Sequence, residues 1–186
     1  MEIKLSEILQ KLSKPLQPHE VGIIADWKSI FKTKQGKYKA LFLIHKTSRS
    51  VYNRFNEVCG LGWFDDYKRD DKGELVCSIS VWDAEKERWI IRKGVGSESS
   101  KDKIKGEYSD ALKRASTAFG FGTELYTMPK IIIDLEPDDV SDEGSSKVSL
   151  SPYFSTKMWR VDYALEGEIV KNLKITDEKC KVRWRM

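Results

Sequence analysis

Basic and small residues share one side of a predicted helix in the middle of the chain. Within residues 103–119 that side carries Lys103, Gly106, Asp110, Arg114, Thr117 and, at its edge, Lys113. Apolar residues recur on the other side at the spacing of an amphipathic helix. Arginine and lysine beside small residues would let a phosphate backbone come close. An ordinary solvated helix face has the same pattern, so these residues alone leave both interpretations open.

Residues for enzymatic chemistry form no convincing set in this sequence. Gly94 and Gly96 lack the third glycine of a dinucleotide fingerprint, and the chain has no phosphate-binding loop of the GxxxxGK[ST] type. Adjacent acids such as Asp65 and Asp66 would point to opposite faces of a strand, which is unsuitable for a two-metal centre. We expect no catalytic residue, no metal and no cofactor, although a nuclease built from dispersed acids stays open.

Cysteine and histidine positions argue against a zinc site. Cys59, Cys77 and Cys180 are scattered without CxxC spacing, and the only histidines are His19 and His45. An odd number of isolated cysteines is typical of reduced thiols.

Composition is that of a globular chain with a heavily charged surface. Of 186 residues, 40% are hydrophobic and 33% are charged. No apolar run approaches the roughly 18 residues needed to span a bilayer, and the first residues resemble no signal peptide. We therefore expect a cytoplasmic protein that does not bind membranes, in a bacterial host cell if it is phage-encoded.

Charge is unevenly distributed along the chain. The net charge is +4, and removing the six acids of one run leaves +10 for the remainder. These acids are Asp134, Glu136, Asp138, Asp139, Asp142 and Glu143. A basic body beside an acidic run fits a protein that binds polyanions, and a solvated linker of arbitrary charge fits equally well.

Apolar periodicity predicts an α+β fold. Helices are expected at residues 3–12, 47–58 and 103–119, and strands at 21–31, 39–45, 62–68, 75–82, 88–93, 159–164, 168–175 and 179–184. The expected architecture is an antiparallel three- to four-stranded β-meander packed on the long helix, with a small C-terminal β-rich appendage. The expected domains are a core at 1–135, an acidic flexible linker at 136–151 and a C-terminal β-meander at 152–186.

Aromatic side chains are expected mainly in the core. This prediction covers Trp63, Trp82, Trp89, Phe119 and Tyr126, whereas Tyr52 and Tyr67 are expected to be exposed.

Two motifs in the middle of the chain resemble a known family. Residues 105–115 read KGEYSDALKRA, and residues 120–129 read GFGTELYTMP. These match the KG-x-x-SDA-x-KRA core and the G-x-G-x-x-LY-x-x-P ending of the Rad-fifty-two/Rad-twenty-two family of single-strand annealing proteins, particularly its short phage-encoded members. Residues 51–63 and 90–96 resemble the family's N-terminal helix and the strand before its GVGS loop, so the resemblance covers residues 49–129.

The resemblance implies a positively charged groove for single-stranded DNA. Lys113 and Arg114 match the family's basic groove pair, and Arg49 lies within one position of its groove arginine. Where eukaryotic members carry a further arginine, this chain has Thr117. The candidate contacts to DNA are Lys113, Arg114, Arg49, Lys101, Lys103, Lys105, Arg92 and Lys93.

The function implied by the resemblance is non-enzymatic. It is ATP-independent binding of single-stranded DNA and annealing of complementary strands in homologous recombination and double-strand break repair. The implied partners are single-stranded DNA and further copies of the chain in a ring or helical filament, and a single-strand binding protein or an exonuclease is left open. Two other functions stay open: a structure-specific nuclease or nuclease accessory, and a plain double-stranded nucleic-acid binding module.

Overall fold

The computed structural model describes residues 4–97, 103–141 and 148–186. Contacts divide the chain into two compact units, which we describe separately: unit 1 holds residues 1–20 and 46–123, and unit 2 holds residues 21–45 and 124–186. Antiparallel sheets accompanied by helices confirm the predicted α+β class. The predicted domain boundaries at residues 135 and 151 state which parts of the chain fold independently, and they stay a prediction. In the structure, residues 21–45 and 124–135 are grouped by their contacts with the C-terminal strands.

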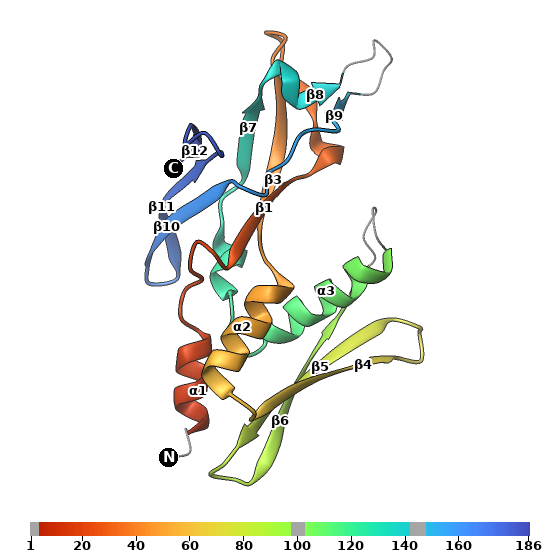
Figure 1. The fold of residues 1–186 in the computed structure, drawn as a ribbon, viewed down its shortest axis with the longest axis vertical. Helices are drawn as coiled ribbons and strands as arrows, with labels where there is room; N and C mark the ends of the chain where they lie inside the picture. Colours follow the sequence, from red (N-terminus) through yellow and green to blue (C-terminus); the bar gives the residue numbers. More distant parts are fainter. Residues whose placement is uncertain (1–3, 98–102, 142–147) are drawn as a thin grey trace. The chain divides into compact units, whose positions relative to one another are not determined.

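Unit 1 combines three helices with one three-stranded sheet (Figure 1). Its elements are α1 (Leu5–Leu12), α2 (Ser48–Cys59), β4 (Trp63–Arg69), β5 (Leu75–Asp83), β6 (Arg88–Val95) and α3 (Lys103–Thr117). The strands pair in the order β4-β5-β6, all antiparallel. The meander and the long helix after it are therefore as predicted.

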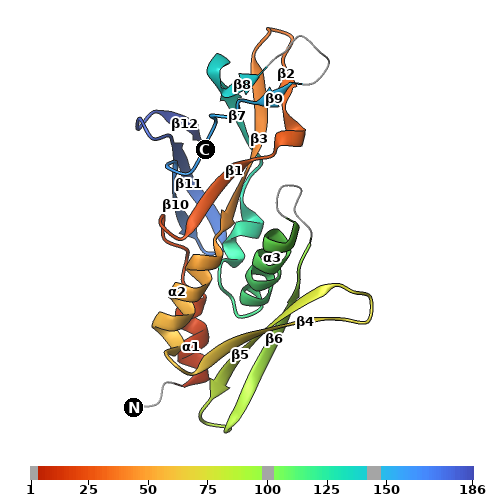
Figure 2. The same ribbon diagram turned by 45° about the vertical axis from the view of Figure 1, so that its right-hand side comes forward.

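Burial alternates along the central strand of unit 1. Leu75, Cys77, Ile79 and Val81 of β5 are almost completely buried, because every second side chain points to the same face. Helices α2 and α3 lie on that face, which we call the helix side (Figure 2). The opposite face, which we call the outer face, is covered by no element of unit 1 that the structure describes.

Local signals explain where the helices begin and end. The Thr47 hydroxyl accepts a hydrogen bond from the Ser50 backbone N–H at 3.0 Å, which forms a capping box at the start of α2. Gly60 follows α2 with φ of 56°, and Gly120 follows α3 with φ of 89°, a backbone conformation that glycine adopts without a steric penalty.

The N-terminal segment is fixed to α2 by one buried arginine. Arg54 forms an ion pair with Glu20 and donates hydrogen bonds to the carbonyls of Lys11, Lys14 and Pro15. A buried guanidinium requires such partners. The connection between α1 and α2 is therefore made by side-chain to backbone bonds that no local pattern predicts.

Unit 2 is built almost entirely from strands. Its elements are β1 (Val21–Ala25), a 3-10 turn (Trp27–Ser29), β2 (Phe31–Lys32), β3 (Tyr38–Lys46), β7 (Ile131–Leu135), a 3-10 turn (Pro137–Asp139), β8 (Val140–Ser141), β9 (Ser149–Leu150), β10 (Arg160–Glu166), β11 (Ile169–Thr176) and β12 (Val182–Arg185). Strand β3 pairs with β1, β2 and β7, whereas β10-β11-β12 form a separate meander.

The two larger sheets of unit 2 share one hydrophobic core. Phe42 and Ile133 of the first sheet pack in the same cluster as Leu173 and Ile175 of the C-terminal meander. Trp159 enters this core and stacks on Phe42, with ring centroids 5.4 Å apart. The C-terminal meander is therefore present as predicted, and it shares its core with strands from the first part of the chain.

Sequence periodicity missed some features of unit 2. Strand β7 was not predicted, although it pairs with β3 in a register from Phe42↔Ile131 to Tyr38↔Leu135. The strand expected over residues 21–31 is interrupted at Trp27–Ser29. Among the described residues, no helix is both long enough and apolar enough to cross a membrane.

Candidate nucleic-acid interface

Helix α3 lies very close to β6 because two glycines face it. A Cβ atom on Gly94 would come within 2.2 Å of the Ala115 nitrogen and 2.6 Å of the Ala111 oxygen. A Cβ atom on Gly96 would come within 2.3 Å of the Glu107 oxygen. The Gly94-x-Gly96 pair therefore serves helix packing, and it holds α3 at a fixed height above the sheet.

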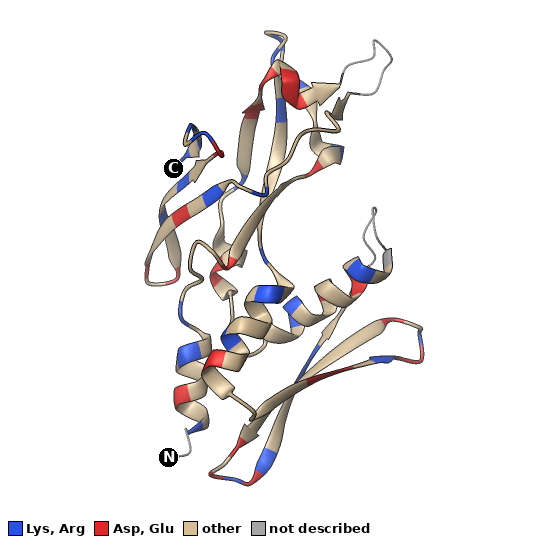
Figure 3. Ribbon diagram, viewed as in Figure 1, with Lys and Arg blue, Asp and Glu red and all other residues tan. Residues whose placement is uncertain are grey.

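The basic dipeptide lies in the last turns of α3. Arg114 is exposed, and its Nε donates a hydrogen bond to Asp110 Oδ2 at 2.9 Å. Lys113 is half-buried, and burial lowers the pKa of its ammonium group; the carboxylate of Asp110 opposes this shift and the charge of Arg114 adds to it. Figure 3 shows the basic positions along α3 and at the start of α2.

Asp110 connects α3 to the end of β6. Its Oδ2 atom accepts hydrogen bonds from the Ser97 backbone nitrogen at 3.0 Å and the Ser97 hydroxyl at 2.7 Å, in addition to the bond from Arg114. The sequence placed Asp110 on the polar face without a role. It orients Arg114 and fixes the residue that follows the strand.

Lys46 is a basic residue near this face that sequence reasoning did not select. Its buried ammonium group donates a hydrogen bond to Thr117 Oγ1 at 2.6 Å and another to the Phe121 carbonyl. Thr117 is the position where the resembled family's eukaryotic members carry an additional arginine. A cation is therefore present there, supplied by a residue 71 positions earlier in the chain, and no local pattern could have indicated it.

Helix α2 brings a further predicted cation to the same side of the sheet. Ser48 Oγ lies 2.7 Å from Ser109 Oγ, so the first turn of α2 is hydrogen-bonded to the middle of α3. Arg49, the next residue, is exposed and forms no ion pair with any residue in the described part of the chain. Lys105 is exposed one helical turn before Ser109.

The remaining predicted residues are dispersed. Arg92 precedes Gly94 by two residues in β6, so its side chain points to the helix side, as Gly94 does. The side chain of Lys93 points to the outer face. The two cannot contact one strand of DNA on the same face. Lys103 begins α3, and Lys101 lies outside the described residues.

Several side chains predicted to be in the core are exposed. Trp89 is 42% exposed and Tyr126 is 76% exposed, because Trp89 occupies the outer face and Tyr126 lies in a short 3-10 turn. Ile104 and Tyr108 of α3 are exposed as well, since this helix buries its Ala111, Leu112 and Ala115 side instead. The apolar face of α3 is therefore narrower than periodicity suggested.

The outer face of the unit 1 sheet is notably apolar. Phe64, Trp89, Ile91 and Val95 are all exposed there. Trp89 contacts both Phe64 and Trp82 edge-to-face, with ring centroids 4.8 Å and 5.3 Å apart. An exposed aromatic and aliphatic surface of this kind usually marks an interaction site.

The adjacent acids of β4 do not converge on one site. Asp65 accepts a hydrogen bond from the Tyr52 hydroxyl at 2.9 Å, and Asp66 points to the opposite face of β4. The described residues contain no group of three or more histidine, cysteine, aspartate or glutamate side chains that could hold a metal ion.

Comparison with known proteins gives relatives among single-stranded DNA-binding proteins. The chain is 32% identical over 136 residues to the single-stranded DNA-binding protein DdrA of Deinococcus deserti, and 29% identical over 133 residues to the protein of the same name from Deinococcus radiodurans. Each match covers 69% of this chain, but only 61% and 59% of the two relatives. The chain thus spans about three fifths of the length of the curated relatives it matches.

No protein-family model matches the chain. No solved structure matches it either. The relationship with the DdrA proteins therefore rests on sequence identity alone.

Proposed function

We propose that this chain binds single-stranded DNA along the outward side of α3 and anneals complementary strands without ATP. The observation that carries the proposal is the arrangement of Lys113 and Arg114 on a helix whose height above the sheet is set by Gly94. Arg49 and Lys105 flank this pair. The names of the two relatives support DNA binding, and the resemblance to the Rad-fifty-two/Rad-twenty-two family supports annealing.

Backbone contacts suit annealing better than base contacts would. A strand held through its phosphates keeps the Watson–Crick edges of its bases available to a second strand. Arginine can grip a phosphate through two hydrogen bonds, and lysine acts as a point charge. We therefore assign this surface a non-enzymatic role, in which the protein concentrates and orients strands in DNA repair.

We further propose that the protein acts as an assembly of several copies. The apolar outer face would be covered by a second copy of this chain, and β4 and β6 are both edge strands of their sheet. An assembly would place many weak phosphate contacts in register, and their combined avidity would exceed the affinity of one copy.

The decisive experiment compares binding and annealing in the same samples. Fluorescence anisotropy should give higher affinity for an unstructured 30-nucleotide strand than for the corresponding duplex, and a quenching assay should show accelerated pairing without nucleotide or divalent metal. An absolute requirement for ATP, equal binding of duplex, or metal-dependent loss of DNA ends on a gel would contradict the proposal. The latter two results would instead favour a double-stranded nucleic-acid binding module and a nuclease.

A further inference from the structure

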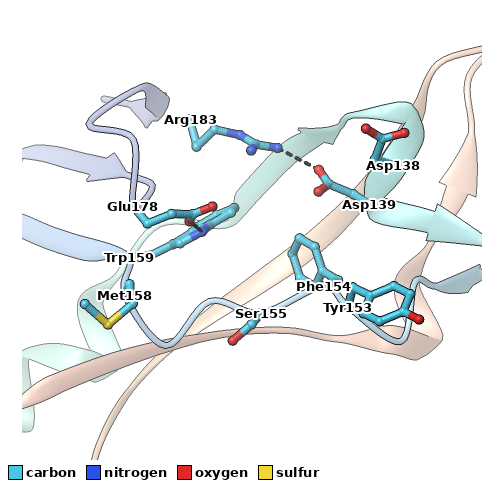
Figure 4. A pocket seen from close by; sticks show the side chains of 9 residues that line it. All are labelled: Asp138, Asp139, Tyr153, Phe154, Ser155, Met158, Trp159, Glu178 and Arg183. Carbon is cyan, nitrogen blue, oxygen red and sulfur yellow. Dashed lines mark hydrogen bonds and ion pairs between the residues drawn. The ribbon is translucent and has the colours of Figure 1, made fainter.

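Unit 2 contains a pocket of about 310 Å³ with aromatic walls and carboxylates around it. Figure 4 shows Trp159 and Glu178 on one side of the pocket and Phe154 and Tyr153 across from them. A volume in this range is typical of ligand sites, although toward the small end. All lining residues belong to the described part of unit 2.

The floor of the pocket is formed by packed aromatic rings, whereas two exposed side chains lie at its mouth. Trp159 is 8% exposed and stacks on Phe42, and Phe154 contacts both rings edge-to-face. At the mouth, Tyr153 is 94% exposed and Met158 is 73% exposed. These two side chains offer apolar contact to a group that enters from solvent.

The single cation in the pocket lining is already engaged by the protein. Arg183 donates hydrogen bonds to Asp139 Oδ2 at 2.9 Å and to the Asp134 carbonyl at 3.1 Å, and its Nη1 atom lies 3.4 Å from Asp177 Oδ2. Its guanidinium also lies 4.9 Å from the centre of the Trp159 ring. Arg183 therefore builds the wall and is not available to bind an anion.

Two carboxylates at the pocket keep acceptor capacity. Asp138 is exposed and has no hydrogen-bond or ion-pair partner among the described residues. Glu178 accepts one hydrogen bond, from Trp159 Nε1 to its Oε2 atom at 3.0 Å, which fixes the carboxylate at the edge of the aromatic wall. A carboxylate has about four lone-pair sites, so Glu178 can accept more bonds.

The chemistry of this lining selects a cation on an aliphatic stem. Carboxylates repel phosphates, which disfavours nucleic acid. Figure 4 shows Met158 and Glu178 at one end of the pocket and Tyr153 and Asp138 at the other. At either end, an arginine or lysine side chain would place its methylene groups against Met158 or Tyr153 and its charged head beside Glu178 or Asp138. Neutral apolar ligands would leave Asp138 without a partner and would not use the remaining acceptor sites of Glu178.

We propose that the unit 2 pocket binds an arginine or lysine side chain from a basic segment of a partner protein. The charge complementarity between the lining carboxylates and such a side chain selects this occupant. The proposal does not depend on DNA binding by unit 1, so either can fail alone. It gives unit 2 the role of recruiting a protein to the site of unit 1 activity.

The test uses a labelled peptide with three arginines spaced by glycine and serine, and the same peptide with neutral citrulline in their place. With all 186 residues of the chain present, anisotropy should show binding of the arginine peptide and none of the citrulline peptide. Asp138→Asn with Glu178→Gln should weaken binding about three- to tenfold, as expected for two exposed ion pairs. Glu166→Gln with Glu168→Gln, which removes two exposed acids elsewhere in unit 2, should change binding less than twofold.

A second variant separates the pocket from general electrostatics. Tyr153→Ala removes an exposed ring without changing charge and should also weaken peptide binding, with an unchanged circular dichroism spectrum. Equal binding of the citrulline peptide, or parent-like binding by both the acid and the tyrosine variants, would overturn the proposal. So would the finding that Asp138→Asn with Glu178→Gln abolishes self-association, since the occupant would then be a second copy.

Discussion

Among the described residues, the helix side of unit 1 leaves a cation, Arg49, exposed without an ion pair, whereas the unit 2 pocket leaves a carboxylate, Asp138, exposed without one. In unit 1, Asp110 orients Arg114, and Glu107 pairs with Arg69 at 2.8 Å. In unit 2, Lys39, Lys181 and Arg183 pair with Asp134, Glu136 and Asp139. Arg49 and Lys113 are left facing outward in one unit, and Asp138 in the other.

This contrast shows that the net charge of a segment does not tell which of its charges can bind a ligand. Three of the four described acids in the run from residue 134 to 143 are paired within unit 2. A surface ion pair contributes little to stability, but it leaves its two charged groups with fewer sites for a ligand. The charges available to a ligand are those that the fold leaves exposed with hydrogen-bonding capacity to spare.

Among the predictions that test the contrast between the two units, the largest effect is expected from a substitution at Gly94. We expect Gly94→Val to destabilise unit 1 by about 3 kcal/mol, because the new side chain would overlap the backbone of α3. Urea unfolding measures the change in the free energy of unfolding. Gly73→Ala is the matched control: its Cβ would meet nothing within 4 Å, and only the strain of φ near 80° remains, about 1 kcal/mol.

If the two units act separately, Gly94→Val should leave binding of the arginine peptide by unit 2 within twofold of the parent. If Gly94→Val unfolds unit 1 and also abolishes peptide binding, the two units fold as one.

The next largest effect concerns the outer face of unit 1. Trp89→Glu with Ile91→Glu should raise the dissociation constant of the assembly about a hundredfold or more, because contact would bury unpaired charges. Light scattering after size-exclusion chromatography measures the mass. Ile169→Glu changes a similarly exposed apolar residue in unit 2 and should leave the mass unchanged. A double variant that keeps the parent mass would exclude the outer face as the contact between copies.

A smaller loss is expected from the basic pair itself. Lys113→Ala with Arg114→Ala should weaken binding of single-stranded DNA about ten- to hundredfold at low salt. The slope of log affinity against log salt should fall by about two at most. Lys72→Ala with Lys86→Ala removes the same charge from exposed hairpin ends of unit 1. If both double variants lose affinity equally, only total charge matters and the groove assignment fails.

The smallest expected effect is on the pH dependence of DNA binding, and it tests whether Lys113 contacts DNA. Only the protonated ammonium attracts phosphate, and burial lowers its pKa below the ordinary value of about 10.4. Affinity should therefore fall about two- to fivefold as pH rises through this lowered pKa, before exposed lysines lose their protons. Lys113→Arg should remove this decline, because arginine stays charged. An identical pH profile for Lys113→Arg would mean that Lys113 does not contact DNA.

Periodicity in the sequence was sufficient to predict most elements of both units. Alternation over residues 75–82 and 88–93 predicted the hairpin of β5 and β6, and the glycines at 120 and 122 predicted the end of α3. These signals are local, because side-chain direction and backbone conformation depend on neighbouring residues. The short strand β7 has no such signal, since its four isoleucine and leucine residues show no clear alternation with polar ones.

The basic pair at Lys113 and Arg114 could be selected from the sequence because both lie on one helix with a recognisable motif. Only the tertiary structure decided that Lys46 reaches Thr117 and that three of the four described acids of the run form ion pairs. Each of these depends on contacts between segments far apart in the chain or on strand register. Such contacts are set by how the sheets and helices pack, which neither composition nor spacing encodes on its own.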